Sequence, residues 1–238
     1  MILLCLLIST IIESTVDSLE MELTRNPQLE TVLALNMCYL KMGDYEHAIQ
    51  LLKEYETTFT VIEIPGILSA LGDDYFFCGK MLEARETYLK LVARFPQSNI
   101  ANDALERLSL IERVRKDTLS LKRLALAICL YETEQFNSAQ ESLKQLLKSA
   151  AGPYAYYYLA LLYRKKDDLS LAVSALEELE HFFAEHEVHN ATLLRAEINA
   201  QLNKKEEAQK ILEDLIVKEP TSIYAVRARQ MLGSGLDF

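Results

Sequence analysis

The sequence has 238 residues, half of them hydrophobic, so the chain can bury a substantial core as one long domain or two short ones. Seven Gly and five Pro are few for this length and argue against the dense turns of an all-β fold, while the abundance of Leu, Ala, Glu and Lys favours long helices. The formal net charge of −10 argues against nucleic acid and anionic lipid as partners, because both attract basic surfaces.

The N-terminal segment, residues 1–27, has two interpretations. Its first twelve residues, MILLCLLISTII, are uncharged and shorter than the roughly 20 apolar residues that a membrane span needs. They resemble the hydrophobic core of an export signal, although no basic residue precedes Arg25 and no clean small-x-small cleavage site follows. The alternative is a retained apolar helix that continues through Leu23 to a stop at Pro27 and covers the first repeat with residues 2–12. The sequence leaves both open.

A repeated pattern follows this segment. Each copy has a turn, then an Ala, then apolar residues four and seven positions further on. The five anchor residues are Ala48, Ala84, Ala139, Ala172 and Ala208. They are separated by 36, 55, 33 and 36 residues, so three of the four spacings lie near a common period.

The second copy carries the fullest version of the pattern. Its characteristic residues are Leu68, Leu71, Gly72, Tyr75, Ala84, Tyr88, Leu91 and Pro96. They resemble the tetratricopeptide repeat, a family of about 34 residues per repeat in which the small anchor lets helix B approach helix A closely. The resemblance covers roughly residues 29–218, and the fifth copy is weaker because Thr192, Arg195 and Asn199 stand where large apolar residues are expected. It implies an all-α, tetratricopeptide-like α-solenoid of about five helix pairs with buried anchors.

The spacing of 55 exceeds one period by 21 residues, enough for one helix and its turn. We expect this inserted helix and a joint at residues 99–118, because an odd helix must cross the stack or reverse it. Its expected apolar face is Ala101, Leu105, Leu108, Ile111 and Val114. Repeats 1 and 2 then fall in residues 28–98, and repeats 3 to 5 with a terminal cap helix fall in residues 119–238.

The cap helix is predicted at residues 221–232. We expect Ile223, Val226 and Met231 on one side and Arg227, Arg229 and Gln230 on the other. The phrases ARFPQSNIANDALERL and VKEPTSIYAVRARQML, in which Pro precedes a capped Ala-rich helix, resemble the bacterial cell-envelope branch of the family. That branch includes the outer-membrane barrel-assembly lipoprotein and the periplasmic partner of the Tol system.

By the same resemblance, positions two, five, nine and twelve of each helix A line a concave partner-binding groove. The predicted groove residues are Leu33, Met37, Leu40, Asp73, Phe76, Leu124, Ile128, Tyr131, Tyr154, Tyr157, Leu161 and Arg164. They are largely apolar and aromatic, unlike the Lys, Asn and Arg with which family members grip chaperone tails. An amphipathic helix or an extended apolar peptide would suit such a groove. The alternative is that these residues pack against neighbouring repeats or against residues 2–12.

No catalytic, cofactor-binding or metal site is predicted. Cys5, Cys38, Cys78 and Cys129 lie far apart in apolar segments without a Cys-x-x-Cys pair, which favours buried free thiols. The segment HFFAEHEVH contains His181, His186 and His189, but the last two straddle a predicted turn, so a solvated loop is the better interpretation. Phosphate-cradling and nucleophile-elbow motifs do not occur in the sequence.

These features predict a non-enzymatic scaffold or adaptor that presents an apolar groove to a protein or peptide partner, in a bacterial envelope assembly. We expect no cofactor, no nucleic acid and no small-molecule substrate, and membrane contact only through the N-terminal apolar segment. The location would be the periplasm or cell envelope, or the cytoplasm in the alternative. A different class also remains open, a regulatory or stalk module of an enzymatic or secretion system whose activity lies in another chain.

Overall fold

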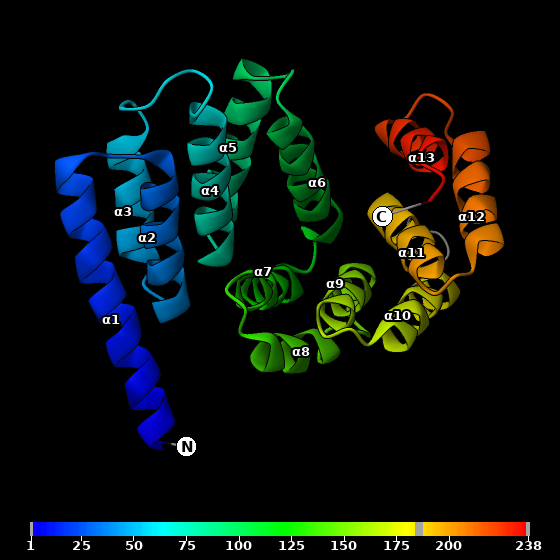
Figure 1. Ribbon diagram of the computed structural model, residues 1–238, viewed down its shortest axis with the longest axis horizontal. Coiled ribbons are helices and arrows are strands. Elements are labelled where there is room, and N and C mark those ends of the chain that lie inside the picture. Colours follow the sequence, from blue (N-terminus) through cyan, green and yellow to red (C-terminus); the bar gives the residue numbers. More distant parts are fainter. Residues whose placement is uncertain (1, 184–187, 237–238) are drawn as a thin grey trace. The chain divides into compact units, whose positions relative to one another are not determined.

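The computed structural model describes the backbone of residues 2–183 and 188–236 and the side chains of residues 11–183 and 188–236. This part of the chain is all-α, with thirteen helices and no strand (Figure 1). It forms two compact units, Met1–Gln135 and Phe136–Phe238. Unit 1 contains α1 (Ile2–Arg25), α2 (Leu29–Met42), α3 (Tyr45–Tyr55), α4 (Ile64–Phe77), α5 (Met81–Arg94), α6 (Asn99–Val114) and α7 (Thr118–Glu132). Unit 2 contains α8 (Phe136–Lys144), α9 (Gly152–Lys165), α10 (Leu169–Phe182), α11 (His189–Gln201), α12 (Lys205–Lys218) and α13 (Ile223–Gly233).

Each turn from a predicted helix A to its helix B contains one residue in the left-handed conformation, with φ between 61° and 79°. These residues are Gly43, Gly79, Glu134, Asp167 and Asn203, each five positions before its anchor Ala. In the first turn, the Gly43 amide donates to the Leu40 carbonyl, which satisfies an end group of α2. The constant offset means that the five turns share one register.

The five anchor alanines are all completely buried, at 0% exposure. A larger side chain at these positions would hold the paired helices apart, which is why the pattern requires a small residue. The prediction of their burial is confirmed, and the fold is a tetratricopeptide-like α-solenoid.

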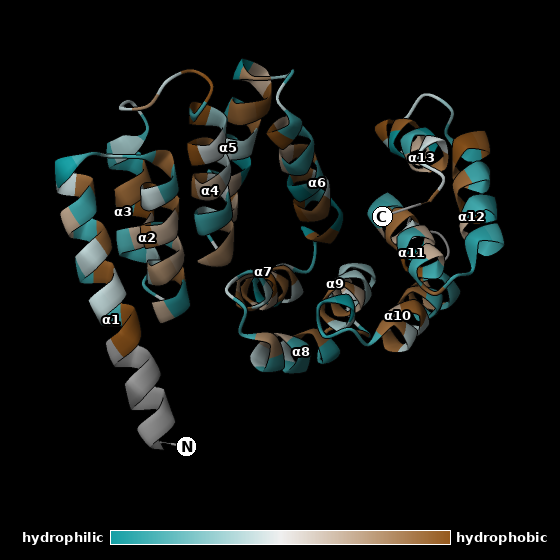
Figure 2. Cartoon of the chain, in the orientation of Figure 1, coloured by the Kyte–Doolittle hydropathy of each residue, from teal (hydrophilic) through white to brown (hydrophobic). Residues whose placement is uncertain are grey.

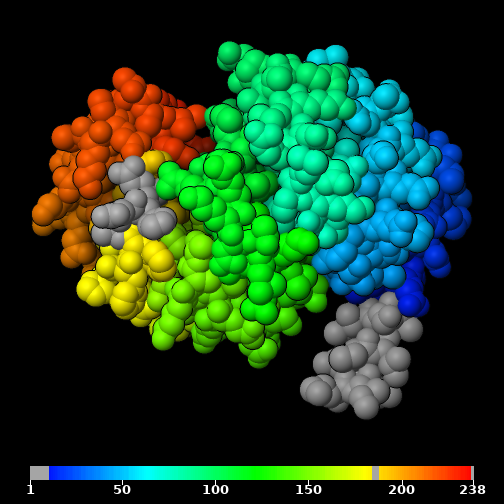
Figure 3. Space-filling view, turned by 180° about the vertical axis from the view of Figure 1, so that it is seen from behind, coloured from blue at the N-terminus to red at the C-terminus, as the bar shows by residue number. Residues whose placement is uncertain are grey.

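Apolar side chains join successive helices within each unit, and the hydrophobic faces are visible in Figure 2. One core of unit 1 is formed by Leu23, Val32, Leu35, Ile49, Leu52, Ile67 and Leu71. A core of unit 2 is formed by Leu193, Ala196, Ala200, Ala208, Leu212, Leu215, Ala228 and Leu236. In the space-filling view, the successive helices of unit 1 form a continuous surface on the face shown (Figure 3).

The helix predicted to precede the repeats extends from Ile2 to Arg25 as α1. Its C-terminal half covers the first repeat, because Leu23 is buried in the unit 1 core and Tyr39 donates a hydrogen bond of 2.7 Å to Glu20. Residues 2–12 were expected to cover apolar surface on the first repeat. The side chains of residues 2–10 lie outside the described part. Among the helices described, none combines the length and apolar character needed to cross a membrane.

The predicted apolar face of α6 is correct for Ala101, Ile111 and Val114, which are buried, but wrong for Leu105, and the predicted face of α13 is wrong for Ile223 and Val226. Both helices begin at a capping Ser, and both bury a pair of alanines three residues apart, Ala101 with Ala104 and Ala225 with Ala228. Three large apolar residues expected to face inward are instead exposed, Leu105 by 48%, Ile223 by 40% and Val226 by 48%. The alanines allow each helix to lie close to the preceding one, and these three side chains are turned outward.

The predicted joint at residues 99–118 does not coincide with the boundary between the units, which falls between Gln135 and Phe136. The inserted helix α6 packs against α5 and α4, and α7 packs against α4 and α6. These contacts hold both helices within unit 1. The odd helix is accommodated beside the first two repeats and does not divide the array there.

The cysteines are free thiols where the structure describes them, but only Cys129 is buried, whereas Cys38 and Cys78 are half-buried. Burial raises the pKa of the Cys129 thiol to about 11, against the lowering effect of its contact with the Tyr45 hydroxyl at 3.9 Å. A thiol with a raised pKa is a weak nucleophile at neutral pH. The side chain of Cys5 lies outside the described part.

Candidate functional site

The groove predicted along unit 1 is largely closed. Leu40, Phe76, Leu124 and Ile128 are buried, at 5% exposure or less. Leu33, Asp73 and Tyr131 are half-buried, and Met37 is exposed by 38%. For the four buried residues the alternative interpretation, packing against neighbouring helices, is correct.

Arg107 on α6 explains the closure over Phe76 and Asp73. Its guanidinium lies 5.6 Å from the centre of the Phe76 ring and forms ion pairs with Asp73 on α4, at 3.0 Å, and with Glu132 on α7, at 2.6 Å. Tyr88 donates a further hydrogen bond of 2.7 Å to Asp73. The inserted helix and α7 therefore cover the face of α4 that was predicted to line the groove, and truncating Phe76 would remove core packing.

In unit 2, three of the four predicted groove residues on α9 are accessible and lie together. Tyr157, Leu161 and Arg164 are half-buried and line a hollow of about 420 Å³. The other residues that line it are Asn190, Leu193, Leu194, Glu197, Arg227, Gln230 and Met231. Tyr154 is also half-buried but does not line this hollow. The hollow is thus formed by α9, α11 and α13.

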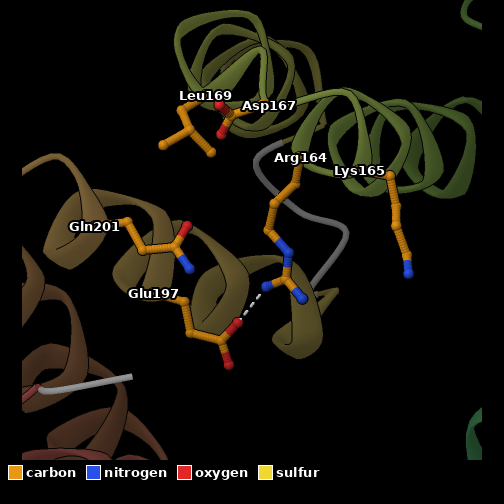
Figure 4. Close-up of a pocket in the computed structure, with 6 residues that line it drawn as sticks. All are labelled: Arg164, Lys165, Asp167, Leu169, Glu197 and Gln201. Carbon is orange, nitrogen blue, oxygen red and sulfur yellow. Dashed lines mark hydrogen bonds and ion pairs between the residues drawn. The ribbon is translucent and has the colours of Figure 1, made fainter.

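A second hollow, of about 610 Å³, adjoins the first (Figure 4). It is lined by Arg164, Lys165, Asp167, Leu169, Glu197 and Gln201. Arg164 and Glu197 line both hollows, and their ion pair joins α9 to α11. In Figure 4 the Arg164 guanidinium points toward Glu197, whereas the Lys165 side chain extends away from this pair. We call the two hollows together the unit 2 groove.

The sequence analysis missed the contribution of α11, although the signal was present. Asn190, Leu193 and Glu197 each follow a predicted groove position of α9 by 36 residues, the separation of anchors Ala172 and Ala208. Extending the groove register to the weak fifth repeat would have found them. Arg227 donates a hydrogen bond of 3.4 Å to Asn190, but α13 was predicted only as a cap.

The unit 2 groove has an apolar end and a charged end. Leu193 and Leu194 are 6% and 4% exposed and form a packed floor beside the more accessible Tyr157, Leu161 and Met231. The charged side chains that line it are Arg164, Lys165 and Arg227 against Asp167 and Glu197. The groove therefore has a small excess of positive charge within a chain whose net charge is −10.

The histidines of HFFAEHEVH do not form a ligand set where they can be described. His181 is exposed and packs on the Phe182 ring, whereas the His189 Nε2 lies 3.3 Å from Glu219 and its ring lies 4.6 Å from that of Tyr224. His186 lies outside the described residues. Within the described ranges no three His, Cys, Asp or Glu side chains are grouped so that they could hold a metal ion.

Comparison with known proteins identifies the repeat. Residues 124–187 match one family model with the description "Tetratricopeptide repeat", and residues 191–222 match another with the same description. These two segments of the chain are tetratricopeptide repeats. No curated protein matches it.

Several solved structures are similar to this chain. PilW, titled a widely conserved type IV pilus biogenesis factor, has 18% identity and a TM-score of 0.42, with 86% of this chain and 98% of that chain covered. MamA from Desulfovibrio magneticus RS-1 has 16% identity, a TM-score of 0.40 and coverage of 82% and 97%. The TPR2AB domain of yeast Sti1, titled as a complex with pHSP90, has 13% identity, a TM-score of 0.43 and coverage of 94% and 90%.

Proposed function

We propose that the chain is a protein-interaction scaffold that binds a peptide segment of a partner in the unit 2 groove. The observation that carries the proposal is the adjoining pair of hollows, in which accessible apolar side chains lie next to charged ones on neighbouring helices. Tyr157, Leu161 and Met231 offer surface to apolar side chains of the partner. Arg164 and Lys165 offer donors to its carboxylate or carbonyl oxygens.

The groove is formed before a partner binds. Its floor residues Leu193 and Leu194 are packed in the free chain, and the Arg164–Glu197 ion pair connects the two helices that flank it. A rigid site loses little conformational entropy on binding, so more of the contact energy remains for affinity. Accessible aromatic side chains such as Tyr157 are the type of residue that contributes most to protein interfaces.

The composition of the groove supports binding without covalent chemistry. The fourteen residues that line the two hollows include no Ser, Thr, Cys or His, the side chains that most often serve as nucleophile or general base. Arg164 and Glu197 are paired with each other. We therefore propose that the chain is not an enzyme and that its activity is recognition.

A display experiment tests this function. A random peptide library is selected on the full chain, and the affinity of the selected peptides is then measured for two variants. Tyr157→Ala removes a ring from the groove and is expected to weaken binding about 5- to 30-fold, which corresponds to 1–2 kcal/mol. Tyr154→Ala is the matched control, because it removes a half-buried ring from the same helix outside the hollows.

Circular dichroism should show that both variants keep the helical fold. Equal loss of affinity in the two variants, or no loss in either, would contradict the proposed groove. The affinity of the selected peptides is also measured for Arg164→Ala. An unchanged affinity would contradict the role given to Arg164 and limit the site to the α11–α13 end of the groove.

We also propose an envelope location. It is supported by the apolar N-terminal segment. It is also supported by ARFPQSNIANDALERL and VKEPTSIYAVRARQML, which resemble the envelope branch of the family and each contain a Ser-capped helix after a Pro. N-terminal sequencing of the protein from its native cell, together with cell fractionation, tests this part. A mature start at Met1 in a cytoplasmic fraction would contradict it and leave the groove proposal intact.

A further inference from the structure

Asp74 on α4 is a carboxyl group buried in unit 1. Its exposure is 0%, and one oxygen, Oδ2, accepts a hydrogen bond of 2.7 Å from the Asn36 amide on α2. The other oxygen, Oδ1, is buried without a hydrogen-bond donor among the described groups. The same Asn36 amide also lies 3.4 Å from the Ala48 carbonyl on α3. Asp74 therefore lies where the first helix pair packs against the second.

The cation that lies beside the neighbouring Asp73 pairs with other carboxylates. Arg107 pairs with Asp73 and Glu132, and Tyr88 from α5 also donates to Asp73. Asp73 and Asp74 are adjacent in sequence but lie on different sides of α4, one in an ion-pair network and one in the core. An ionised carboxylate in an apolar interior costs several kcal/mol unless a cation or several donors compensate.

The other titratable groups close to Asp74 do not supply such compensation. These are Asp73 and Tyr75 on α4, Cys78 directly after α4, and Cys129 on α7. Tyr45 from α3 faces Cys129, to which its hydroxyl donates at 3.9 Å. All of these side chains are neutral or negative at neutral pH. Their charged forms would repel an ionised Asp74.

The balance of these effects favours the neutral acid. Burial raises the pKa of the Asp74 carboxyl from 3.8 to about 8, the Asn36 hydrogen bond lowers it in part, and the charge of Asp73 raises it. This rise in the pKa agrees with the geometry, because a buried carboxyl that accepts one hydrogen bond and has no cation beside it is more stable in its protonated form.

We propose that Asp74 makes the packing of the first two helix pairs sensitive to pH: it is a neutral carboxylic acid while α2 and α3 are packed on α4, and its ionisation opens this junction. Asn36 is the positioning residue that holds the acid between α2 and α4. The partner groove of unit 2 contains no such group, so the two units would respond differently to pH.

The sign of the effect follows from proton linkage. In the opened state Asp74 has an ordinary pKa near 4 and has lost its proton at neutral pH, whereas the packed state keeps it up to about pH 8. Raising the pH from about 5 to about 8 therefore favours the opened state, by up to tenfold in the opening equilibrium constant per pH unit. Above about pH 8 both states are ionised and the dependence on pH ends.

Native-state hydrogen exchange of the full chain tests the proposal. Peptides from α2, α3 and α4 are followed between pH 6 and 9, and opening constants are obtained after correction for the intrinsic exchange rate. In the unaltered protein the constants should rise with pH and level off near pH 8. Peptides from α11 and α12 should show no such rise and serve as a control within the same molecule.

Asp74→Asn should remove the rise, because its amide cannot ionise, while Asp73→Asn should keep it. A direct measurement does not depend on either variant folding: the ¹³C resonance of the Asp74 carboxyl in the unaltered chain should titrate near pH 8. Titration near pH 4, or an unchanged rise in Asp74→Asn, would overturn the proposal.

Discussion

Gly72→Ala is expected to destabilise unit 1 by about 1–3 kcal/mol, because a Cβ at this position would lie 2.5 Å from Cε1 of Tyr88. The Tyr88 ring cannot easily move aside, since it is completely buried and its hydroxyl is bound to Asp73 at 2.7 Å. The loss should exceed the gain of about 0.5–1 kcal/mol that Ala brings to a helix interior. Urea unfolding followed by circular dichroism measures the difference.

Gly66→Ala provides the matched control in the same helix. Its Cβ would meet only Leu29 Cδ2, at 3.7 Å, an ordinary van der Waals contact. This variant is expected to gain up to about 1 kcal/mol from helix propensity. The two substitutions should therefore change stability in opposite directions, and a similar effect for both would show that α4 and α5 do not approach closely at Gly72.

Arg107→Ala is expected to destabilise unit 1 by about 2–3 kcal/mol. The change leaves Asp73 and Glu132 without their shared cation and removes the guanidinium from the Phe76 ring. Removing one partner of a buried ion pair costs about 3–5 kcal/mol, and the somewhat exposed carboxylates here reduce that figure. The unfolding midpoint in urea should fall accordingly, and α6 and α7 should exchange amide hydrogens faster.

Arg115→Ala is the control for this prediction. Arg115 pairs with Glu112 at 3.0 Å, but both side chains are more than half exposed, at 62% and 55%. An exposed pair of this kind contributes about 0–1 kcal/mol. A loss in Arg107→Ala no larger than that in Arg115→Ala would contradict the role given to Arg107 in closing unit 1.

The sequence predicted the parts of the fold that depend on neighbours along the chain. The five buried anchors and the turn before each depend on one helix hairpin at a time, so their spacing is visible in the sequence. Ala104 and Leu105 show the limit of this approach, because Leu105 was expected on the buried face of α6 but is exposed, while Ala104 is buried. Which of these two neighbouring residues faces inward depends on how close α5 lies, which hydrophobic spacing does not specify.

The candidate site was predicted only in part, for a similar reason. Tyr157, Leu161 and Arg164, which were predicted from the repeat register, line the hollow between α9, α11 and α13. The closure over Phe76 was not predicted, because it depends on Arg107 meeting Asp73, 34 residues earlier, and Glu132, 25 residues later. Contacts at such separations have no local pattern, and α6 has no counterpart in the regular repeat.

The most direct test of the scaffold proposal is a hydrogen-exchange map of the full chain with and without a peptide selected on it. Binding in the unit 2 groove predicts slower exchange in α9, α11 and α13, with no change in α2 to α5. Protection confined to unit 1, or to helices α10 and α12 alone, would contradict the assignment of the groove as the partner-binding surface.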